Sequence, residues 1–265
     1  LNVLHEDCKL PNTVGGTSID RFCASSLEAI AMADAFVGRN PNEVYICTGV
    51  QSMSRIPMGG LNPHLNKKVH DGNPAAFMDM PFTAENLAEI YKIPRKDQDE
   101  FAIRSHDRHA AAAKSGRFKD EIVPIAGLDH DDGVREGGTV EGLAKLKPVA
   151  KDESEGGTVT AATASQITDG ASAVMVTSEA FAKENNLPVM ARILSVGQSG
   201  CDPEIMGIGP VEASKKALEK AGLTMDDIDV IELNEAFAAQ SLSVMAEWKK
   251  QNMAPDMDKV NVNGG

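Results

Sequence analysis

The stretch that most constrains the fold is residues 19–54, where a helix, a strand and a turn follow one another. Apolar side chains recur at helical spacing between Leu27 and Ala35, and Gly38 is suited to ending the helix. Residues 44–48 (VYICT) are β-branched and aromatic, which predicts a short buried strand. A helix and a strand in this order predict an α/β layer, because each buries its apolar face against the other.

The rest of the chain continues this alternation of strands and helices. We expect short strands over residues 171–176, which read as a central strand, 190–196 and 228–233, and the start of another at Val260. Start and stop signals predict five further helices: one with Thr83 as its N-cap, one from Pro94 to Ala113, one over residues 179–184, one from Pro210 to Gly222 and one after Phe237. Residues 55–72 interrupt the pattern with Pro, Gly, Asn and Lys, and long irregular segments are often functional.

Cys23 stands where the first helix begins. The free N–H groups at a helix N-terminus favour an anion, and the thiolate is the reactive form of cysteine. The flanking residues, Asp20 and Arg21 before it and Ser25 after it, are not those of a plain core segment. Cys23 is therefore a candidate nucleophile, although a small buried apolar residue is the ordinary alternative for a free cysteine.

Composition argues against several classes of partner. The chain has 265 residues and a net charge of −13 at pH 7, which disfavours binding to nucleic acid or to an anionic membrane surface. No apolar run approaches the ~18 residues of a membrane-spanning helix. An anionic ligand therefore has to be held by local basic groups.

The cysteines and histidines give two further expectations. The four cysteines lie far apart with no CxxC pair, which predicts a reduced, cytoplasmic protein without disulfides: Cys8, Cys23, Cys47 and Cys201. His106 and His109 share one helix face, but no third ligand is placed to complete a metal site. We therefore expect a solvated helix face there and no metal. Both chain ends, at Leu1 and Gly265, look like cuts through a domain.

Eight short motifs resemble the thiolase family and follow its order along the chain. They are residues 20–25 (DRFCAS), 49–54 (GVQSMS), 83–86 (TAEN), 116–122 (GRFKDEI), 168–171 (TDGA), 206–210 (MGIGP), 234–239 (NEAFAA) and 260–265 (VNVNGG). Eight motifs in register are far more specific than any one alone. The chain is similar to the acetyl-CoA C-acyltransferases, or 3-ketoacyl-CoA thiolases, and looks truncated at both ends.

The resemblance implies the α/β thiolase fold, in which two similar halves stack into five layers, αβαβα, with an inserted loop domain. It implies an N-terminal half over residues 1–52 plus 168–189, without its lead-in. The inserted loop domain would occupy residues 53–167. A C-terminal half would cover residues 190–265, and the fold would be incomplete here.

The resemblance also implies a chemistry and roles for named residues. Cys23 would attack a thioester or a 3-ketoacyl-CoA and carry the acyl group, and Asn234 would hold a water in an oxyanion hole. Arg135 and Ser165 fall on positions that contact coenzyme A in the family. Three residues fall on positions that line the acyl and pantetheine pocket, with core packing as the alternative reading: Met80, Met206 and Phe237.

The implied ligands are acyl-CoA and CoA, used as substrates in fatty acid β-oxidation, with no bound cofactor. The implied assembly is a homodimer or homotetramer. The chain lacks the family's Gly-His-Pro histidine and its second cysteine, so we expect this chain alone to be nearly inactive. An acetoacetyl-CoA-specific biosynthetic thiolase, an inactive CoA-binding fragment and a papain-like hydrolase remain as alternatives. The first usually has His-Met-Gly where this chain has residues 79–81, Asp-Met-Pro.

Overall fold

A computed structural model describes residues 10–265 of the chain, so Cys8 lies outside the described residues. The chain forms two compact units. One contains the chain up to Ile56 together with Thr168–Ile193, and the other contains Pro57–Ile167 and Leu194–Gly265. The three-part division of the chain given above stays a prediction.

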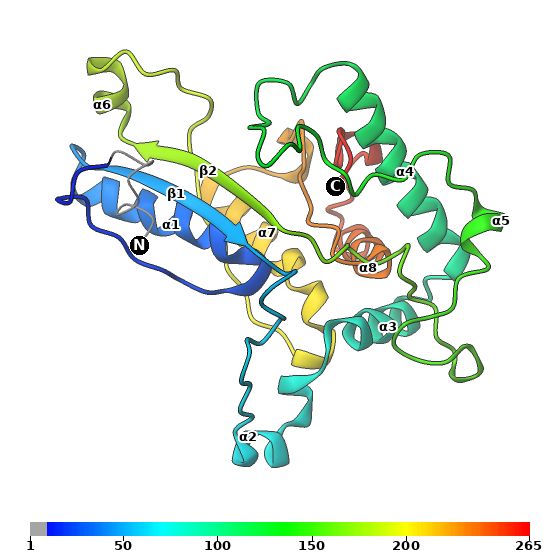
Figure 1. Ribbon diagram of the computed structural model, residues 1–265. Coiled ribbons are helices and arrows are strands. Elements are labelled where there is room, and N and C mark those ends of the chain that lie inside the picture. The colour runs from blue at the N-terminus through cyan, green and yellow to red at the C-terminus, as the bar shows by residue number, and fades with distance from the viewer. Residues whose placement is uncertain (1–9) are drawn as a thin grey trace. The chain divides into compact units, whose positions relative to one another are not determined.

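The first unit is built on two antiparallel strands and one long helix (Figure 1). Strands β1 (Val44–Gln51) and β2 (Gly170–Thr177) pair from Val44 opposite Thr177 to Gln51 opposite Gly170. Helix α1 (Ser25–Arg39) packs along one face of this pair, and the short helix α6 (Glu179–Glu184) follows β2. The helices predicted after Cys23 and over residues 179–184 are confirmed, but α1 is not ended by Gly38, which lies inside it, and continues to Arg39.

Close backbone approach joins α1 to the strands. The buried Cys47 lies with its Sγ 3.5 Å from the carbonyl of Ala29. A Cβ added at Gly49 would come within 3.1 Å of the Ser26 Cβ, so the absence of a side chain lets the helix and the strand touch. The first turn of α1 is therefore held directly against β1.

The strands differ from expectation in their burial. We expected β1 to be buried and β2 to be a central strand, but within the described residues each pairs only with the other. Their outer face carries exposed apolar side chains, for example Ile46 at 54% and Met175 at 56%. Only the face that packs on α1 is covered, which explains why Cys47 alone in β1 is buried.

The second unit is mostly helical (Figure 1). Its α-helices, apart from the 3₁₀ turns, are α2 (Lys67–Gly72), α3 (Met80–Tyr91), α4 (Arg95–Lys114), α5 (Val140–Leu143), α7 (Pro210–Ala221) and α8 (Ala238–Lys250). Helix α8 is central to its core, where Val244 and Trp248 are 0% and 1% exposed. A smaller cluster packs Ala239 of α8 against α3 and Val159. None of the helices in the described part of the chain is long and apolar enough to cross a membrane.

Most predicted helix boundaries are confirmed to within one residue. Helix α4 begins after Pro94 and α7 begins at Pro210, since proline suits the first turn of a helix. The N-cap predicted at Thr83 is wrong, because the N-cap of α3 is Asp79, four residues earlier. The Thr83 hydroxyl instead donates within the helix to the Met80 carbonyl, at 2.7 Å.

The strands predicted over residues 190–196 and 228–233, and from Val260, are wrong. The first is irregular, and its Ser195 hydroxyl donates to the Ala217 carbonyl of α7 at 2.6 Å. The other two meet in a single parallel bridge between Ile231 and Val260. The ladder stops there because the next partner of Leu233 is the side chain of Asn261 rather than its backbone.

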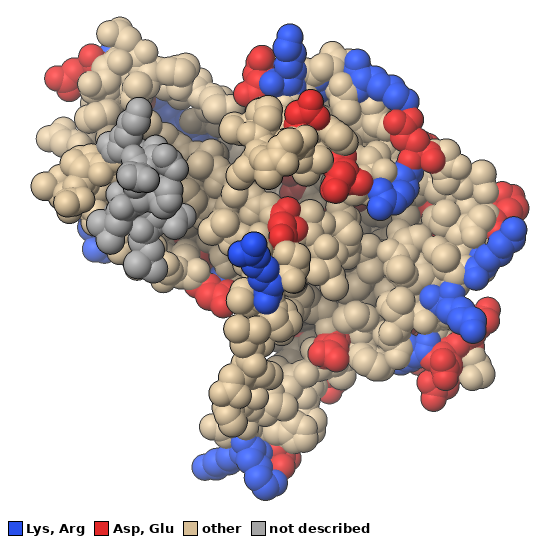
Figure 2. Space-filling model, viewed as in Figure 1, with Lys and Arg blue, Asp and Glu red and all other residues tan. Residues whose placement is uncertain are grey.

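Charges of both signs are mixed on the face of the molecule drawn in Figure 2. Lysine and arginine side chains do not gather there into one basic patch. With a net charge of −13, an anionic ligand of this chain depends on individual cations placed at its site.

Candidate functional site

Cys23 is presented on a braced turn in the first unit. It lies in the 3₁₀ turn Phe22–Ala24, directly before α1, and its side chain is exposed. Phe22 has φ +47°, a left-handed conformation that costs a non-glycine residue about 1–2 kcal/mol. Neighbouring side chains hold this turn: Asp20 Oδ1 accepts from the Phe22 amide at 2.9 Å, and the Ser25 hydroxyl donates to the Phe22 carbonyl at 2.7 Å. The geometry is that of a strained turn that exposes a nucleophile before a helix.

The other described thiols lie in less reactive surroundings. Burial raises the pKa of the Cys47 thiol. Burial and the Asp202 carboxylate raise the pKa of the Cys201 thiol. A raised pKa lowers the thiolate fraction at neutral pH, so neither group is a good nucleophile. Cys23 therefore stands out as the candidate nucleophile among the cysteines of residues 10–265.

A carboxylate to which the sequence analysis assigned no role joins the two strands of the first unit. Asp169, just before β2, accepts from the Ser54 amide at 2.8 Å, the Ser54 hydroxyl at 2.6 Å and the Ser52 hydroxyl at 3.3 Å. These hydrogen bonds, chiefly those from Ser54, hold the pKa of Asp169 below its usual value. Asp169 thus fixes the turn that leaves β1, and no local pattern announces a contact over 115 positions.

In the second unit, Asn234 is exposed and lies between Leu233, which is buried, and Glu235, which is half-buried. The side chain of Asn261, which is 1% exposed, holds this segment by hydrogen bonds. Its Oδ1 accepts from the Leu233 amide and its Nδ2 donates to the Leu233 carbonyl, both at 2.8 Å, and Nδ2 also donates to Glu235 Oε1 at 2.6 Å. Asn234 is therefore flanked by two residues fixed through one buried side chain.

The segment that carries Ser165 lies beside the segment that carries Asn234. The Ser165 amide donates to the Ala236 carbonyl at 2.9 Å, and the Ala238 amide donates to the Thr163 carbonyl at 2.8 Å. Ala164 and Phe237 form an antiparallel bridge between them. The predicted site residue Ser165 thus pairs with Ala236, two residues after Asn234 in the same segment.

Arg135 lines a cavity of about 260 Å³ next to Ser165. Ala164 and Gln166, on either side of Ser165, line the same cavity. The Arg135 guanidinium donates to the carbonyl of Asp132 at 2.9 Å, so the charge is held on its own loop. A cavity with one cation and small alanine walls is suited to a ligand that is anionic at one point and flat or apolar elsewhere.

The histidine face of α4 is not the solvated face that we expected. His106 is half-buried at this cavity, and its Nδ1 accepts the Arg135 amide at 3.3 Å. Burial, and next the Arg135 charge, lower the pKa of His106. His109 is also half-buried, stacks on Phe118 with ring centroids 4.8 Å apart and has Nε2 3.3 Å from Asp131 Oδ2.

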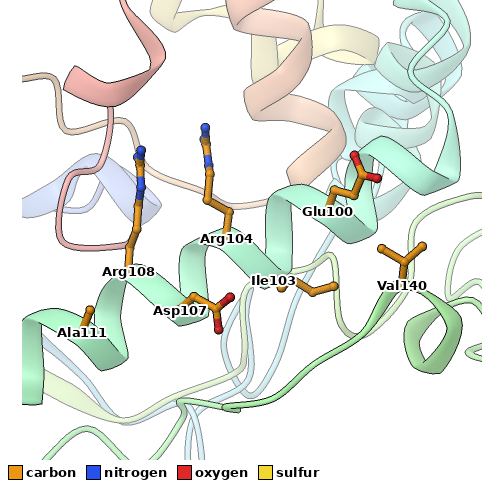
Figure 3. Close-up of a pocket in the computed structure, with 7 residues that line it drawn as sticks. All are labelled: Glu100, Ile103, Arg104, Asp107, Arg108, Ala111 and Val140. Carbon is orange, nitrogen blue, oxygen red and sulfur yellow. The ribbon is translucent and has the colours of Figure 1, made fainter.

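A larger and more open hollow, of about 440 Å³, lies along α4 (Figure 3). Arg104 and Arg108 extend to the same side of the helix, while Ile103 and Asp107 point to the other, on the side of Val140. Arg108 is already engaged, since its Nη1 donates to the Val260 carbonyl at 2.6 Å. Arg108 thus ties α4 to the segment that leads to Asn261.

Three further predicted residues lie on elements that pack against one another. Met80 begins α3, Met206 lies in the 3₁₀ turn Pro203–Ile208, and Phe237 immediately precedes α8. The 3₁₀ turn contacts both α3 and α8, and a Cβ at Gly207 would lie 2.9 Å from Leu87 and 2.7 Å from Gln240. Met206 remains 44% exposed, whereas Phe237 packs on the smaller core cluster. Phe237 thus packs on the core, as the core-packing alternative predicts, whereas the exposed Met206 does not.

Comparison with known families gives a match along almost the whole chain. Residues 2–180 match the family described as "Thiolase, N-terminal domain". Residues 187–265 match "Thiolase, C-terminal domain".

Curated relatives and solved structures agree with these matches. The 3-ketoacyl-CoA thiolase of Pseudoalteromonas translucida (strain TAC 125) is 44% identical over 97% of this chain and 67% of its own length. That of Vibrio cholerae serotype O1 (strain ATCC 39541) is 46% identical over the same shares, so the chain spans about two thirds of these relatives. Two crystal structures of human mitochondrial 3-ketoacyl-CoA thiolase, one of them in complex with CoA, each have a TM-score of 0.84 at 38% identity, covering 98% of this chain and 68% of that one. The dimeric peroxisomal thiolase of Saccharomyces cerevisiae has a TM-score of 0.88 at 33% identity, covering 98% and 66%.

Proposed function

We propose, from the premise that the chain belongs to the thiolase family, that it is the greater part of an acyltransferase working between a cysteine thioester and CoA. The observation that carries this is the exposed Cys23 on its strained, side-chain-braced turn before α1. The thiolase fold of the chain and its 3-ketoacyl-CoA thiolase relatives support the same reaction class.

The proposed first step is a thioester exchange at Cys23. Its sulfur forms a bond to the acyl carbon of an acyl-CoA while the bond from that carbon to the CoA sulfur breaks. The Cys23 proton leaves with the CoA thiol, so the products are acyl-Cys23 and free CoA. Covalent catalysis of this kind divides one difficult transfer into two easier ones.

We propose that Asn234 holds a water that stabilises the enolate of acetyl-CoA in the carbon–carbon step. Fixed donors at an oxyanion contribute about 3–4 kcal/mol in comparable acyl-transfer enzymes. The exposure of Asn234 between two fixed neighbours supports this role. Proton transfer at carbon needs acid and base groups, and such groups contribute about 10²- to 10⁴-fold each.

We propose that the cavity at Arg135 and Ser165 receives the CoA moiety, and that Met80, Met206 and Phe237 line the path of its pantetheine and acyl chain. The positive charge and small walls of the cavity support the first assignment. The packing of α3, the 3₁₀ turn and α8 supports the second.

The proposed substrates are 3-ketoacyl-CoA thioesters, cleaved by CoA as in fatty acid β-oxidation or formed in the reverse condensation. The names of the relatives support this over an acetoacetyl-specific reaction, as does the Asp-Met-Pro sequence at residues 79–81. We propose a homodimer, because the yeast peroxisomal thiolase is dimeric, with a homotetramer as the alternative. Free thiols at Cys23, Cys47 and Cys201 support a reducing, cytoplasmic location.

The test is acetylation of Cys23. A full-length protein that contains this chain is mixed with acetyl-CoA, and its cysteine-containing peptides are analysed by mass spectrometry. We expect an acetyl thioester on Cys23 and not on Cys47 or Cys201, and its loss in Cys23→Ser. Iodoacetamide should also label Cys23 fastest. A protein that binds CoA but leaves Cys23 unmodified is a CoA-binding module, and the proposal is then wrong.

A further inference from the structure

We propose that Asn261 is a positioning residue that fixes the backbone on both sides of Asn234 and so aims the Asn234 amide in the carbon–carbon step. The proposal rests on the function proposed above and adds to it a residue that does not touch the substrate.

The Asn261 side-chain carboxamide uses its oxygen and both of its donors on the residues that flank Asn234. One carboxamide oxygen and both amide protons are engaged: Oδ1 with the Leu233 amide at 2.8 Å, Nδ2 with the Leu233 carbonyl at 2.8 Å and Nδ2 with Glu235 Oε1 at 2.6 Å. At 1% exposure no water competes for these contacts. Buried hydrogen bonds of this kind are costly to leave half-made, about 1–3 kcal/mol for each orphaned group.

The side chain replaces a rung of a parallel ladder. The Ile231 amide donates to the Lys259 carbonyl at 2.9 Å, and the Asn261 amide donates to the Ile231 carbonyl at 2.8 Å. At Asn261 the backbone turns away with φ +48°, and its side chain then pairs with Leu233 in place of the next backbone group. Asparagine suits this position because it tolerates the left-handed conformation and carries both a donor and an acceptor. Aspartate lacks the donor and would set a carboxylate against Glu235.

Asn261 is itself held rigidly. Val260 is 0% exposed in the main core of the second unit, and its carbonyl accepts from Arg108 Nη1 of α4 at 2.6 Å. A Cβ at Gly265 would lie 2.5 Å from Asn261 Nδ2, so the chain folds back tightly over the amide. The core and α4 therefore fix Asn261 in place, and Asn261 in turn fixes Leu233 and Glu235.

Asn234 is the exposed residue between these fixed points, and the paired Ser165 amide holds Ala236 just beyond. Its side-chain direction is set by the backbone of its neighbours. A displacement of about 1 Å in a catalytic group lowers the rate by about 100-fold. Loss of the hydrogen bonds from Asn261 to Leu233 and Glu235 should therefore slow the step that uses Asn234 and leave the acylation of Cys23 unchanged.

The experiment compares Asn261→Asp, Asn234→Ala and Asn252→Asp in two assays. Asn252 is a matched control, since it is also left-handed, with φ +58°, but exposed. Because this chain alone is expected to be nearly inactive, the assays use a full-length protein that contains it; they are acetylation of Cys23 by acetyl-CoA and thiolysis of a 3-ketoacyl-CoA. In Asn261→Asp we expect thiolysis kcat to fall about 10- to 100-fold. The acetylation rate and the KM for CoA should stay within about twofold of their values in the unsubstituted protein. Asn252→Asp should change neither. Adding Glu235→Gln should recover part of the lost rate, because a Gln amide can donate to the new carboxylate.

Each outcome separates the two proposals. If Asn234→Ala leaves thiolysis unchanged, the role proposed for Asn234 is wrong, and the role of Asn261 falls with it. If Asn234→Ala slows thiolysis and Asn261→Asp does not, only the positioning role is overturned. Equal loss of acetylation and thiolysis in Asn261→Asp, with a lowered Tm, would mean that Asn261 merely supports the fold and would also overturn it.

Discussion

At the scale of single residues, the chemistry of the chain depends on side chains that hold backbone in unusual conformations. Phe22 is left-handed beside Cys23, and Asn261 is left-handed below Asn234. In both places a short polar side chain supplies hydrogen bonds that regular secondary structure would otherwise provide: Asp20 for the Phe22 amide and Asn261 for Leu233. The reactive groups themselves, Cys23 and Asn234, are left exposed.

The strain at Phe22 gives a prediction about stability. Its side chain is 62% exposed, so truncation removes little packing. Phe22→Gly relieves the left-handed strain, whereas Phe22→Ala keeps it, so the glycine variant should be more stable than the alanine variant by up to about 1 kcal/mol. Urea unfolding of both variants measures the difference. Alanine equal to or better than glycine would show that position 22 is not left-handed in solution.

At the scale of elements, a buried carboxylate ties α3 to the loop that leads to Ser165. Glu85 is 2% exposed, and its carboxylate accepts from the Thr158 amide, the Thr158 hydroxyl and the Val159 amide, each at 2.8 Å. A short loop from Val159 then brings Ser165 into its pairing with Ala236. The wall of the Arg135 cavity therefore depends on a residue outside it.

Glu85→Gln should loosen that loop. A Gln amide turns a donor toward donors, so at least one buried group loses its partner, and the free energy of unfolding should fall by about 1–3 kcal/mol. We expect the KM for CoA to rise more than kcat falls, since the loop carries the proposed CoA contacts. Glu89→Gln, at a side chain 79% exposed beside Lys151, is the control and should change stability by less than about 0.5 kcal/mol. If Glu85→Gln is destabilised but the KM for CoA is unchanged, the contact of Glu85 with the loop does not contribute to CoA binding.

Local signals explain which elements could be predicted from the sequence. Pro94 and Pro210 mark the starts of α4 and α7 because a proline acts within its own turn. Residues 228–233 have the composition of a strand, yet a ladder requires a partner, and here the partner is the side chain of Asn261. Cys23 and Asn234 could be found from motifs, whereas the contact of Asp169 with Ser54 could not, because nothing local encodes it.

At the scale of the whole molecule, charge sets the conditions for ligand binding. The chain carries −13 at pH 7, and an anionic CoA approaches against that field. The exposed Arg135 at its cavity has to outweigh the repulsion locally. Attraction to one exposed cation is screened by salt over a Debye length of about 10 Å at 0.1 M ionic strength.

Arg135→Gln should therefore raise the KM for CoA about tenfold at low ionic strength, consistent with the loss of one charge-assisted hydrogen bond. The increase should shrink at high salt, where the native guanidinium is already screened. Arg192→Gln, at an exposed arginine paired with Glu179, serves as the control. Steady-state kinetics in CoA at two salt concentrations measure both, and a salt-independent effect would point to a steric role for Arg135.

The contact between Gly49 and Ser26 makes the reactive turn unusually sensitive to a residue in the neighbouring strand. No side chain separates the two backbones there, so a methyl group at position 49 would press against Ser26 in the first turn of α1. Ser26, in the first turn of α1 close to Cys23 in the chain, would have to move by a few tenths of an ångström to make room for it. Strand β1 thus supports the helix turn next to Cys23, and a substitution at position 49 that leaves the fold intact can still misplace the thiol.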